Sequence, residues 1–142
     1  MFLCVSLNPA VDKRLRLERL QLGGVNRVNE AIPAPGGKAA HVAMTLKTLG
    51  ADPLWLGFAG GAAGKQLVEG LRGLAIRVHD IPTTRSTRTN LEIVEDMGGV
   101  TEILEPGQHI TAEELRRFQE TFSILLNEAS EQTTVIFSGS LN

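Results

Sequence analysis

The strongest candidate for an anion-binding group is Lys38, which follows Gly36 and Gly37 at the start of a predicted helix. Backbone N–H groups, the positive end of the helix dipole and the lysine ammonium could converge there on one phosphate or polar sugar edge. The alternative is a glycine turn followed by a solvated lysine. The segment therefore predicts an anion site that other residues must complete.

Other polar side chains are placed where they could share a ligand with Lys38. Asp12 follows the first predicted strand, and its carboxylate could accept hydrogen bonds from the hydroxyls of a polyol, with a turn-forming aspartate as the alternative. Arg88 and Asn90 are two residues apart, so on a strand they face the same side and offer a phosphate fork and an amide; the alternative is an exposed strand face. The run 138–140 (Ser-Gly-Ser) follows the last predicted strand and offers hydroxyls, or is a plain turn.

Strands that alternate with helices must position these groups. Apolar runs and their boundaries predict strands over 1–7, 53–59, 76–81 and 133–137, and helices over 39–49, 63–71 and about 111–127. The last helix begins with a capping-box pattern at Thr111. This order predicts an α/β fold with a mainly parallel sheet flanked by helices, whose ligands bind outside the carboxyl ends of the strands.

The spacing of apolar residues predicts which helix faces are buried. The expected buried residues are Val42, Leu46 and Leu49 in the first helix, Leu67, Val68 and Leu71 in the second, and Leu115, Phe118, Phe122 and Leu125 in the third. The last strand, 133–137, is expected to be buried.

Two segments do not fit a parallel sheet. Apolar and charged residues alternate over 13–34, and two alternating runs, 87–95 and 100–104, flank a glycine-bearing turn. They predict a small β-strand lid, approximately residues 12–35 and 87–105, laid over the carboxyl edge of the sheet, where a moving cover could exclude water. Residues 1–142 are expected to form part of one domain.

The composition favours a small ligand. Of the 142 residues, 42% are hydrophobic, and 16 acidic residues face 14 scattered basic ones, which does not indicate nucleic-acid binding. Cys4 lies in an apolar run and is expected to be a core thiol. The start of the chain lacks the basic segment of a signal peptide, and no run approaches the roughly 18 apolar residues of a membrane span, so we expect a cytoplasmic protein without membrane association.

Known nucleotide and metal motifs are missing. Residues 60–65 (GGAAGK) resemble a P-loop, but Ala59 stands where its first glycine should be and Gln66 replaces the hydroxyl residue that would hold magnesium. His41, His79 and His109 are too far apart in sequence for local metal spacing.

The same segments, taken together, are similar to the phosphofructokinase B (ribokinase-like) family of carbohydrate kinases, most of all to 1-phosphofructokinases and tagatose-6-phosphate kinases. The matching segments are SLNPAVD (6–12), VNR (25–27), GGKAAHVA (36–43), GFAGG (57–61), TRTN (87–90), TEILEPG (101–107) and SGSLN (138–142). They occur in the family's order and spacing across the whole chain. The resemblance therefore covers the amino-terminal half of such a kinase.

The resemblance implies an activity and a set of substrate-binding residues. The family transfers the γ-phosphoryl group of Mg-ATP to a phosphorylated ketose, for example from fructose 1-phosphate to fructose 1,6-bisphosphate. The implied substrate-binding residues are Asp12, Gly36, Gly37 and His41 on the sugar, Lys38, Arg88, Asn90 and Ser138 on the phosphate, and, more weakly, Arg27. Family members often form a homodimer through the lid.

Three departures from the family pattern qualify this expectation. Ala39 and His41 replace a glycine and an asparagine, and Asn142 stands where the family has proline. The family's GAGD motif, which carries the base aspartate, and its nucleotide-binding residues belong to a second half that these 142 residues do not contain. The expected function is thus the sugar-phosphate half of a kinase that is inactive alone. The alternatives are a tagatose-6-phosphate kinase and a noncatalytic sugar-phosphate-binding or assembly module.

Overall fold

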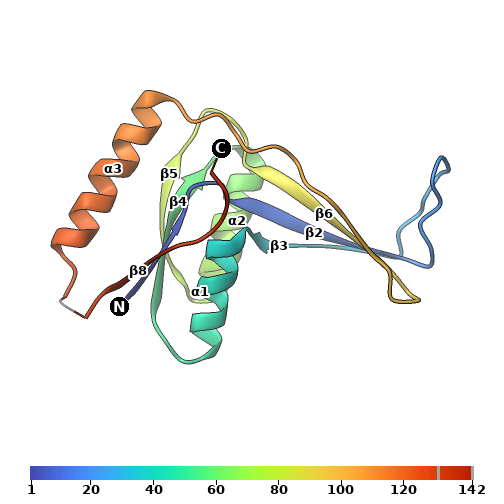
Figure 1. Ribbon diagram of the computed structural model, residues 1–142, viewed down its shortest axis with the longest axis horizontal. Helices are drawn as coiled ribbons and strands as arrows, with labels where there is room; N and C mark the ends of the chain where they lie inside the picture. Colours follow the sequence, from blue (N-terminus) through green and yellow to red (C-terminus); the bar gives the residue numbers. More distant parts are fainter. Residues whose placement is uncertain (131, 142) are drawn as a thin grey trace.

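Alternating strands and helices form the body of the computed structural model, which describes residues 1–130 and 132–141 (Figure 1). Asn142, one of the departures from the family pattern, lies outside the described residues. In chain order the elements are β1 (Phe2–Ser6), β2 (Ala10–Leu17), β3 (Glu30–Gly36), α1 (Lys38–Thr48), β4 (Pro53–Ala59), α2 (Gly61–Gly73), β5 (Arg77–Pro82), β6 (Arg88–Glu95), β7 (Val100–Ile103), α3 (Ala112–Asn127) and β8 (Thr134–Phe137).

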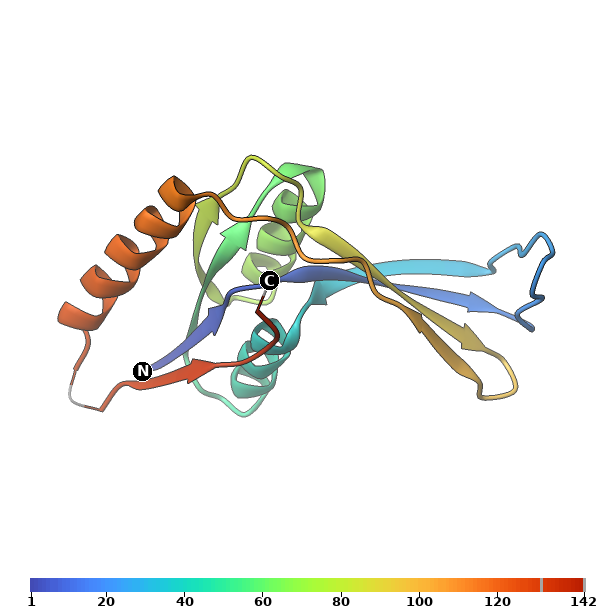
Figure 2. The same cartoon turned by 45° about the horizontal axis from the view of Figure 1, so that its top comes forward.

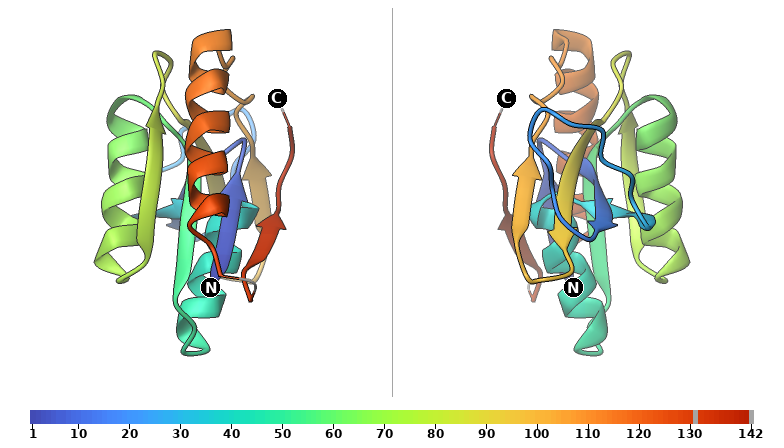
Figure 3. Two further views of the ribbon diagram at one scale, coloured as in Figure 1. Left: turned by 90° about the vertical axis from the view of Figure 1, so that its left-hand side faces the viewer. Right: turned by 90° about the vertical axis from the view of Figure 1, so that its right-hand side faces the viewer.

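The main sheet is parallel and has the strand order β5-β4-β1-β8. Helices α1 and α2 lie on one face and α3 on the other (Figures 1 and 3). Every residue of β4 is buried, as expected for a parallel strand covered on both faces. The predicted α/β fold is therefore confirmed.

The core is divided by the sheet into two clusters. On the α3 side, Leu3 and Val5 of β1 pack with Phe58 of β4 and Phe118 of α3. On the α1 and α2 side, Cys4 packs with residues that include Trp55. Burial raises the pKa of the Cys4 thiol to about 11, which fits the predicted core thiol.

Two predicted helix faces were wrong in part. Helix α1 buries Ala39, Ala40 and Ala43, whose small side chains let it approach the sheet closely, whereas Leu49 follows the helix end and is 76% exposed. In α3, Leu115 is 45% exposed because the neighbouring Glu114 faces the β5–β6 connection instead.

The last strand also differs from its prediction. β8 was expected to be buried, but it lies at the edge of the main sheet, beside β1 only. Thr134 and Phe137 are consequently exposed. The sequence predicted the strand's position, but the prediction that it is buried was wrong.

The segments predicted to form a lid, approximately residues 12–35 and 87–105, contribute the strands of a second sheet. It has the order β3-β2-β6-β7, in which β2 is antiparallel to β3 and parallel to β6, and β6 and β7 form a hairpin. Figure 2 shows these four strands extending away from the α/β body. We call this four-stranded sheet the lid sheet.

Two features of the lid sheet correct or explain the sequence analysis. Asp12 was placed beyond the first strand, in a possible turn, but it lies inside β2, which starts at Ala10. β3 contains Pro33 and Pro35, which an edge strand tolerates because proline cannot donate to a second neighbour.

In the described part of the chain no helix is both long enough and apolar enough to cross a membrane.

Candidate functional site

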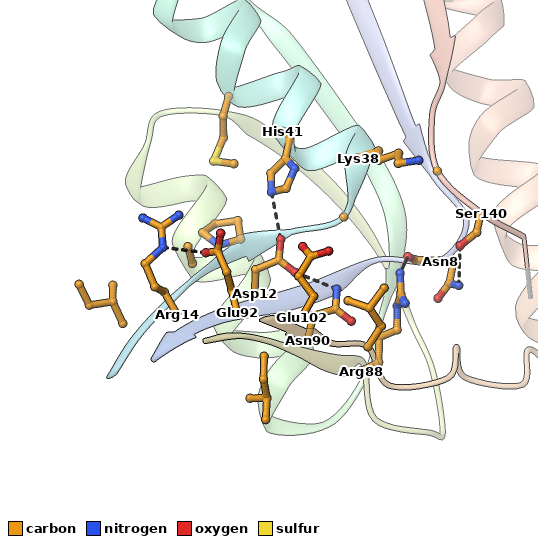
Figure 4. Close-up of a pocket in the computed structure, with 18 residues that line it drawn as sticks. Asn8, Asp12, Arg14, Lys38, His41, Arg88, Asn90, Glu92, Glu102 and Ser140 are labelled. Carbon is orange, nitrogen blue, oxygen red and sulfur yellow. Dashed lines mark hydrogen bonds and ion pairs between the residues drawn. The ribbon is translucent and has the colours of Figure 1, made fainter. Parts of the chain in front are cut away.

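A pocket of about 750 Å³ lies where the lid sheet meets the amino-terminal end of α1 (Figure 4). This volume is within the usual range for small-molecule sites. Six of the predicted site residues line it: Asp12, Gly37, Lys38, His41, Arg88 and Asn90. Residues from separate parts of the sequence thus share one cavity.

Asp12 is the best-fixed group in this pocket. Its Oδ1 accepts a hydrogen bond of 2.9 Å from Nδ2 of Asn90, its register partner on β6. Its Oδ2 lies 3.0 Å from Nε2 of His41 on α1. The carboxyl group also rests against Gly36 at the end of β3, where any Cβ atom would collide with it. Three elements therefore hold one half-buried carboxylate in place.

The amino-terminal end of α1 forms the next part of the pocket wall. Gly37 precedes the helix with φ 84° and ψ 147°, a conformation open essentially only to glycine. The helix starts at Lys38, and its first turn contains no acidic residue. The positive end of the helix and the Lys38 side chain therefore face the pocket without a competing carboxylate on the same turn.

Arg88 enters the pocket from β6. Its Nη1 donates to the backbone oxygen of Glu105 (3.2 Å) and its Nη2 donates to that of Asn8 (3.3 Å). Its Nε is buried and has no hydrogen-bond partner among the described residues. Because alternate residues of a strand face the same side, Asn90 lies in the same pocket, as the spacing predicted.

Sequence reasoning missed four polar residues that line the pocket, Asn8, Arg14, Glu92 and Glu102, whereas Ser140 belongs to the run 138–140 that it had considered. Arg14 donates from Nε to Oε2 of Glu92 at 2.7 Å, and this hydrogen bond raises the pKa of the guanidinium. The two-residue period was the available signal, since Arg14 follows Asp12 and Glu92 follows Asn90 at that spacing. Asn8 appeared in the sequence analysis only as part of the segment SLNPAVD (6–12), without a role of its own.

The structure does not bring every predicted residue to the pocket. Arg27 lies on the exposed loop between β2 and β3, outside the residues that line the cavity. Ser138 follows β8, but Gly139 and Ser140 form the lining at that point. Gly36 is not part of the pocket lining, but it lies against the carboxyl group of Asp12. The binding roles of Arg27 and Ser138 stay predictions.

The described residues, 1–130 and 132–141, contain no group of three or more His, Cys, Asp or Glu side chains that could hold a metal ion. The P-loop-like run at 60–65 instead forms the entry to α2, which begins at Gly61.

Comparison with known proteins gives one family. The sequence model of the family described as pfkB family carbohydrate kinase matches residues 5–142 of this chain. A tagatose-6-phosphate kinase of Staphylococcus epidermidis is 36% identical over 141 residues, which are 99% of this chain and 44% of that protein.

Solved structures agree with this similarity. A Thermotoga maritima protein described as a possible 1-phosphofructokinase is 32% identical, with a TM-score of 0.88 over 99% of this chain and 45% of that one. Phosphofructokinase-2 of Escherichia coli, solved with fructose 6-phosphate, is 25% identical with a TM-score of 0.89 over the same shares. The chain thus spans less than half the length of these relatives, and the likeness lies in their shared fold.

Proposed function

The chain belongs to the pfkB family of carbohydrate kinases, and we propose that it forms the sugar-phosphate-binding part and the lid of an ATP-dependent ketose-phosphate kinase. The reaction is the transfer of the γ-phosphoryl group of ATP to a free hydroxyl of the ketose phosphate. One observation carries the proposal: a carboxylate held by two partners, Asp12, shares its pocket with the cations of Lys38 and Arg88.

The distribution of charge along the pocket supports this assignment. In Figure 4, Lys38 and Arg88 lie towards the end formed by Asn8 and Ser140, whereas Asp12 and its partners lie nearer the middle. Cations bind a phosphate group by charge-assisted hydrogen bonds, and a carboxylate accepts hydrogen bonds from sugar hydroxyls. The phosphate already on the substrate therefore binds at the cationic end and the sugar beside Asp12.

We propose fructose 1-phosphate as the acceptor, with tagatose 6-phosphate as the second candidate. The Staphylococcus epidermidis relative is named a tagatose-6-phosphate kinase, and the Thermotoga maritima relative is described as a possible 1-phosphofructokinase. Both support a ketose phosphate. His41, in place of the asparagine of the family pattern, contacts Asp12 on the sugar side and is the residue by which this chain differs in that subsite.

ATP and Mg²⁺ belong to the proposal for the whole kinase. On the family pattern, in which the GAGD motif carries the base, we assign the nucleotide, Mg²⁺ and the catalytic base to residues other than these 142. The 142-residue chain alone should accordingly release no ADP from ATP above background. If fructose 1-phosphate stimulated the release of ADP by this chain alone, the assignment would be contradicted.

The lid sheet is the proposed surface for a homodimer. Its pocket-side face carries the exposed side chains of Ile32 and Leu104, and Val100 faces the same side by strand alternation. Exposed apolar side chains grouped on one sheet face mark an interaction surface. A second copy packed on this face would cover both the apolar side chains and the mouth of the pocket.

Calorimetric titration of the chain tests the substrate assignment. We expect fructose 1-phosphate or tagatose 6-phosphate to bind more tightly than fructose or inorganic phosphate, because only the phosphorylated ketose meets both ends of the pocket. Arg88→Ala should weaken binding about tenfold or more, the usual effect of losing a charge-assisted hydrogen bond. Lys65→Ala, which removes an exposed cation on α2 outside the pocket lining, should leave it unchanged. Equal affinity for fructose and its phosphate would refute the assignment.

A further inference from the structure

Glu105, in the segment TEILEPG (101–107), contacts the cationic end of the pocket without lining the pocket itself. Strand β7 ends at Ile103. The antiparallel register of β6 and β7, continued beyond this end, brings Glu105 opposite Thr89. Glu105 therefore faces the start of β6, where Thr89 follows Arg88.

The side chain of Glu105 takes the place of a backbone partner at this point. Its Oε2 accepts a hydrogen bond of 2.7 Å from the backbone N–H of Thr89. In a continued antiparallel ladder, the backbone oxygen of Glu105 would be the ordinary acceptor for that N–H group. Pro106, which has no N–H to give to a ladder, follows at once. The backbone oxygen of Glu105 is thus left free for another donor.

That donor is the guanidinium of Arg88. Its Nη1 donates to the free backbone oxygen of Glu105 at 3.2 Å, and its Nη2 donates to the backbone oxygen of Asn8 at 3.3 Å (Figure 4). Each Nη nitrogen keeps a further N–H, and the buried Nε has no partner among the described residues. The group is therefore held by its two outer nitrogens, with donors left to grip two oxygens of one phosphate.

The charge of Glu105 shows that its own role is not to bind the ligand. A carboxylate repels a phosphate group, so an acidic side chain at the cationic end of the pocket weakens phosphate binding unless it acts in another way. Its hydrogen bond to the Thr89 N–H directs the carboxylate to the backbone of β6. What Glu105 contributes to binding must then come through Arg88, whose orientation is fixed before a ligand arrives.

We infer that Glu105 is a positioning residue for Arg88: its carboxylate occupies the Thr89 N–H, so that its backbone oxygen can orient the guanidinium towards the substrate phosphate. This inference rests on the proposed function, in which Arg88 binds that phosphate. It also makes the grip on the phosphate depend on the β6–β7 hairpin, because the hairpin brings Glu105 to Arg88.

Calorimetric titration with matched variants tests this role. In Glu105→Ala the Thr89 N–H is free to take the backbone oxygen of residue 105 from Arg88. Affinity for fructose 1-phosphate and for inorganic phosphate should therefore fall about fivefold, the usual effect of losing one hydrogen bond. Glu95→Ala is the matched control, since Glu95 at the other end of β6 accepts the backbone N–H of Leu20, also at 2.7 Å. This control should keep normal affinity.

The conservative variant separates the oxygen of Glu105 from its charge. Glu105→Gln keeps an oxygen that can accept the Thr89 N–H and removes the charge that repels phosphate. It should bind fructose 1-phosphate at least as tightly as the unmodified chain does. A loss as large as that of Glu105→Ala would contradict the inference.

A double-mutant cycle separates positioning from a merely structural effect. If Glu105 acts through Arg88, Glu105→Ala should cost no further affinity for fructose 1-phosphate once Arg88→Ala is present. A merely structural role would lower the affinity by the same factor in both backgrounds, and that result would refute the inference.

The outcomes also distinguish this inference from the proposed function. If the unmodified chain binds fructose 1-phosphate more tightly than fructose, but Glu105→Ala binds it as the unmodified chain does, the role of Glu105 is refuted while the proposed function stands. If the unmodified chain binds fructose and fructose 1-phosphate equally, both are refuted.

Discussion

His41 on α1 and Asp12 on β2 are in direct contact, with Nε2 of the imidazole 3.0 Å from Oδ2 of the carboxylate. This contact joins the first turn of a helix of the α/β body to the lid sheet, directly above Gly36. About half of the imidazole is exposed and the carboxylate is partly so. Solvent-exposed polar contacts contribute little to stability, so the contact acts mainly by orienting Asp12 towards the ligand.

His41→Ala should therefore affect ligand binding more than folding. We expect about a fivefold to tenfold loss of affinity for the ketose phosphate, the usual effect of removing one good hydrogen bond, with little change in melting temperature. Affinity for inorganic phosphate should be unchanged, because that ligand occupies only the cationic end. Calorimetric titration with both ligands measures the difference. Parallel losses for both ligands would contradict the position given to His41.

Gly37 should be intolerant of a side chain. Gly37→Ala places a Cβ on a residue with φ 84° and ψ 147°, and we expect a loss of roughly 1–3 kcal/mol in the free energy of unfolding. Gly73→Ala is the matched control, since a Cβ there meets no atom within 4 Å and the residue ends α2. Alanine favours helices over glycine, so this control should be neutral or slightly stabilising. Urea unfolding measures the change in unfolding free energy for both variants. Equal changes for Gly37→Ala and Gly73→Ala would contradict the prediction.

Glu114 should make stability depend on pH. Its carboxylate accepts hydrogen bonds from the backbone N–H of Thr111 (2.8 Å) and of Thr84 (2.7 Å), and the first of these contributes most to lowering its pKa from 4.5 to about 2. A lowered pKa means that the stabilisation is fully present above pH 4.5 and is lost as the pH falls from 4.5 through 2. Glu114→Gln, which turns an N–H group towards donors, should cost roughly 1–3 kcal/mol at neutral pH.

Chemical unfolding at several pH values measures this effect. The difference in unfolding free energy between the unmodified chain and Glu114→Gln should shrink steadily below pH 4.5. Glu128→Gln removes an exposed carboxylate at the other end of α3 and should show neither the cost nor the pH dependence. A difference that stays constant down to pH 2 would show that Glu114 acts by packing and not by its charge.

Leu104 tests the lid-sheet dimer. It is 60% exposed on the pocket side of the lid sheet, and a second copy packed there would bury it. Leu104→Lys should convert a dimer into a monomer, because a charge buried in an apolar interface without a partner is strongly unfavourable. Leu49→Lys, at an exposed leucine after α1, should leave the mass unchanged. Sedimentation at several concentrations measures the mass of each variant and of the unmodified chain. An unmodified chain that sediments as a monomer would refute the dimer.

Local sequence signals predicted most of the fold. The capping box at Thr111 and Glu114 forms as expected, and the last helix ends at Asn127. Alternating strands and helices gave the parallel sheet, and the glycine-bearing turn gave the β6–β7 hairpin. These features depend on neighbours in sequence, which is why one sequence was sufficient to predict them.

The predictions failed where contacts between residues far apart in the sequence determine the structure. Leu49 and Leu115 fit a helical stripe, but burial depends on where each helix crosses the sheet, and alanines form the α1 contact. In the site, Asp12 and Asn90 were both predicted, but the hydrogen bond between them was not, because the β2–β6 register that pairs them joins residues 78 positions apart. Asn8 was missed because its contacts with Arg88 and Ser140 join residues 80 and 132 positions apart in the sequence.

The central claim is that the pocket between the lid sheet and α1 binds a ketose phosphate. Its most direct test is a map of backbone amide shifts in the ¹H–¹⁵N spectrum as fructose 1-phosphate is added to the chain. The account predicts saturable shifts centred on Asp12, Lys38, Arg88 and Asn90, with little change along the outer face of α3. An unchanged spectrum, or shifts centred on α3, would contradict it.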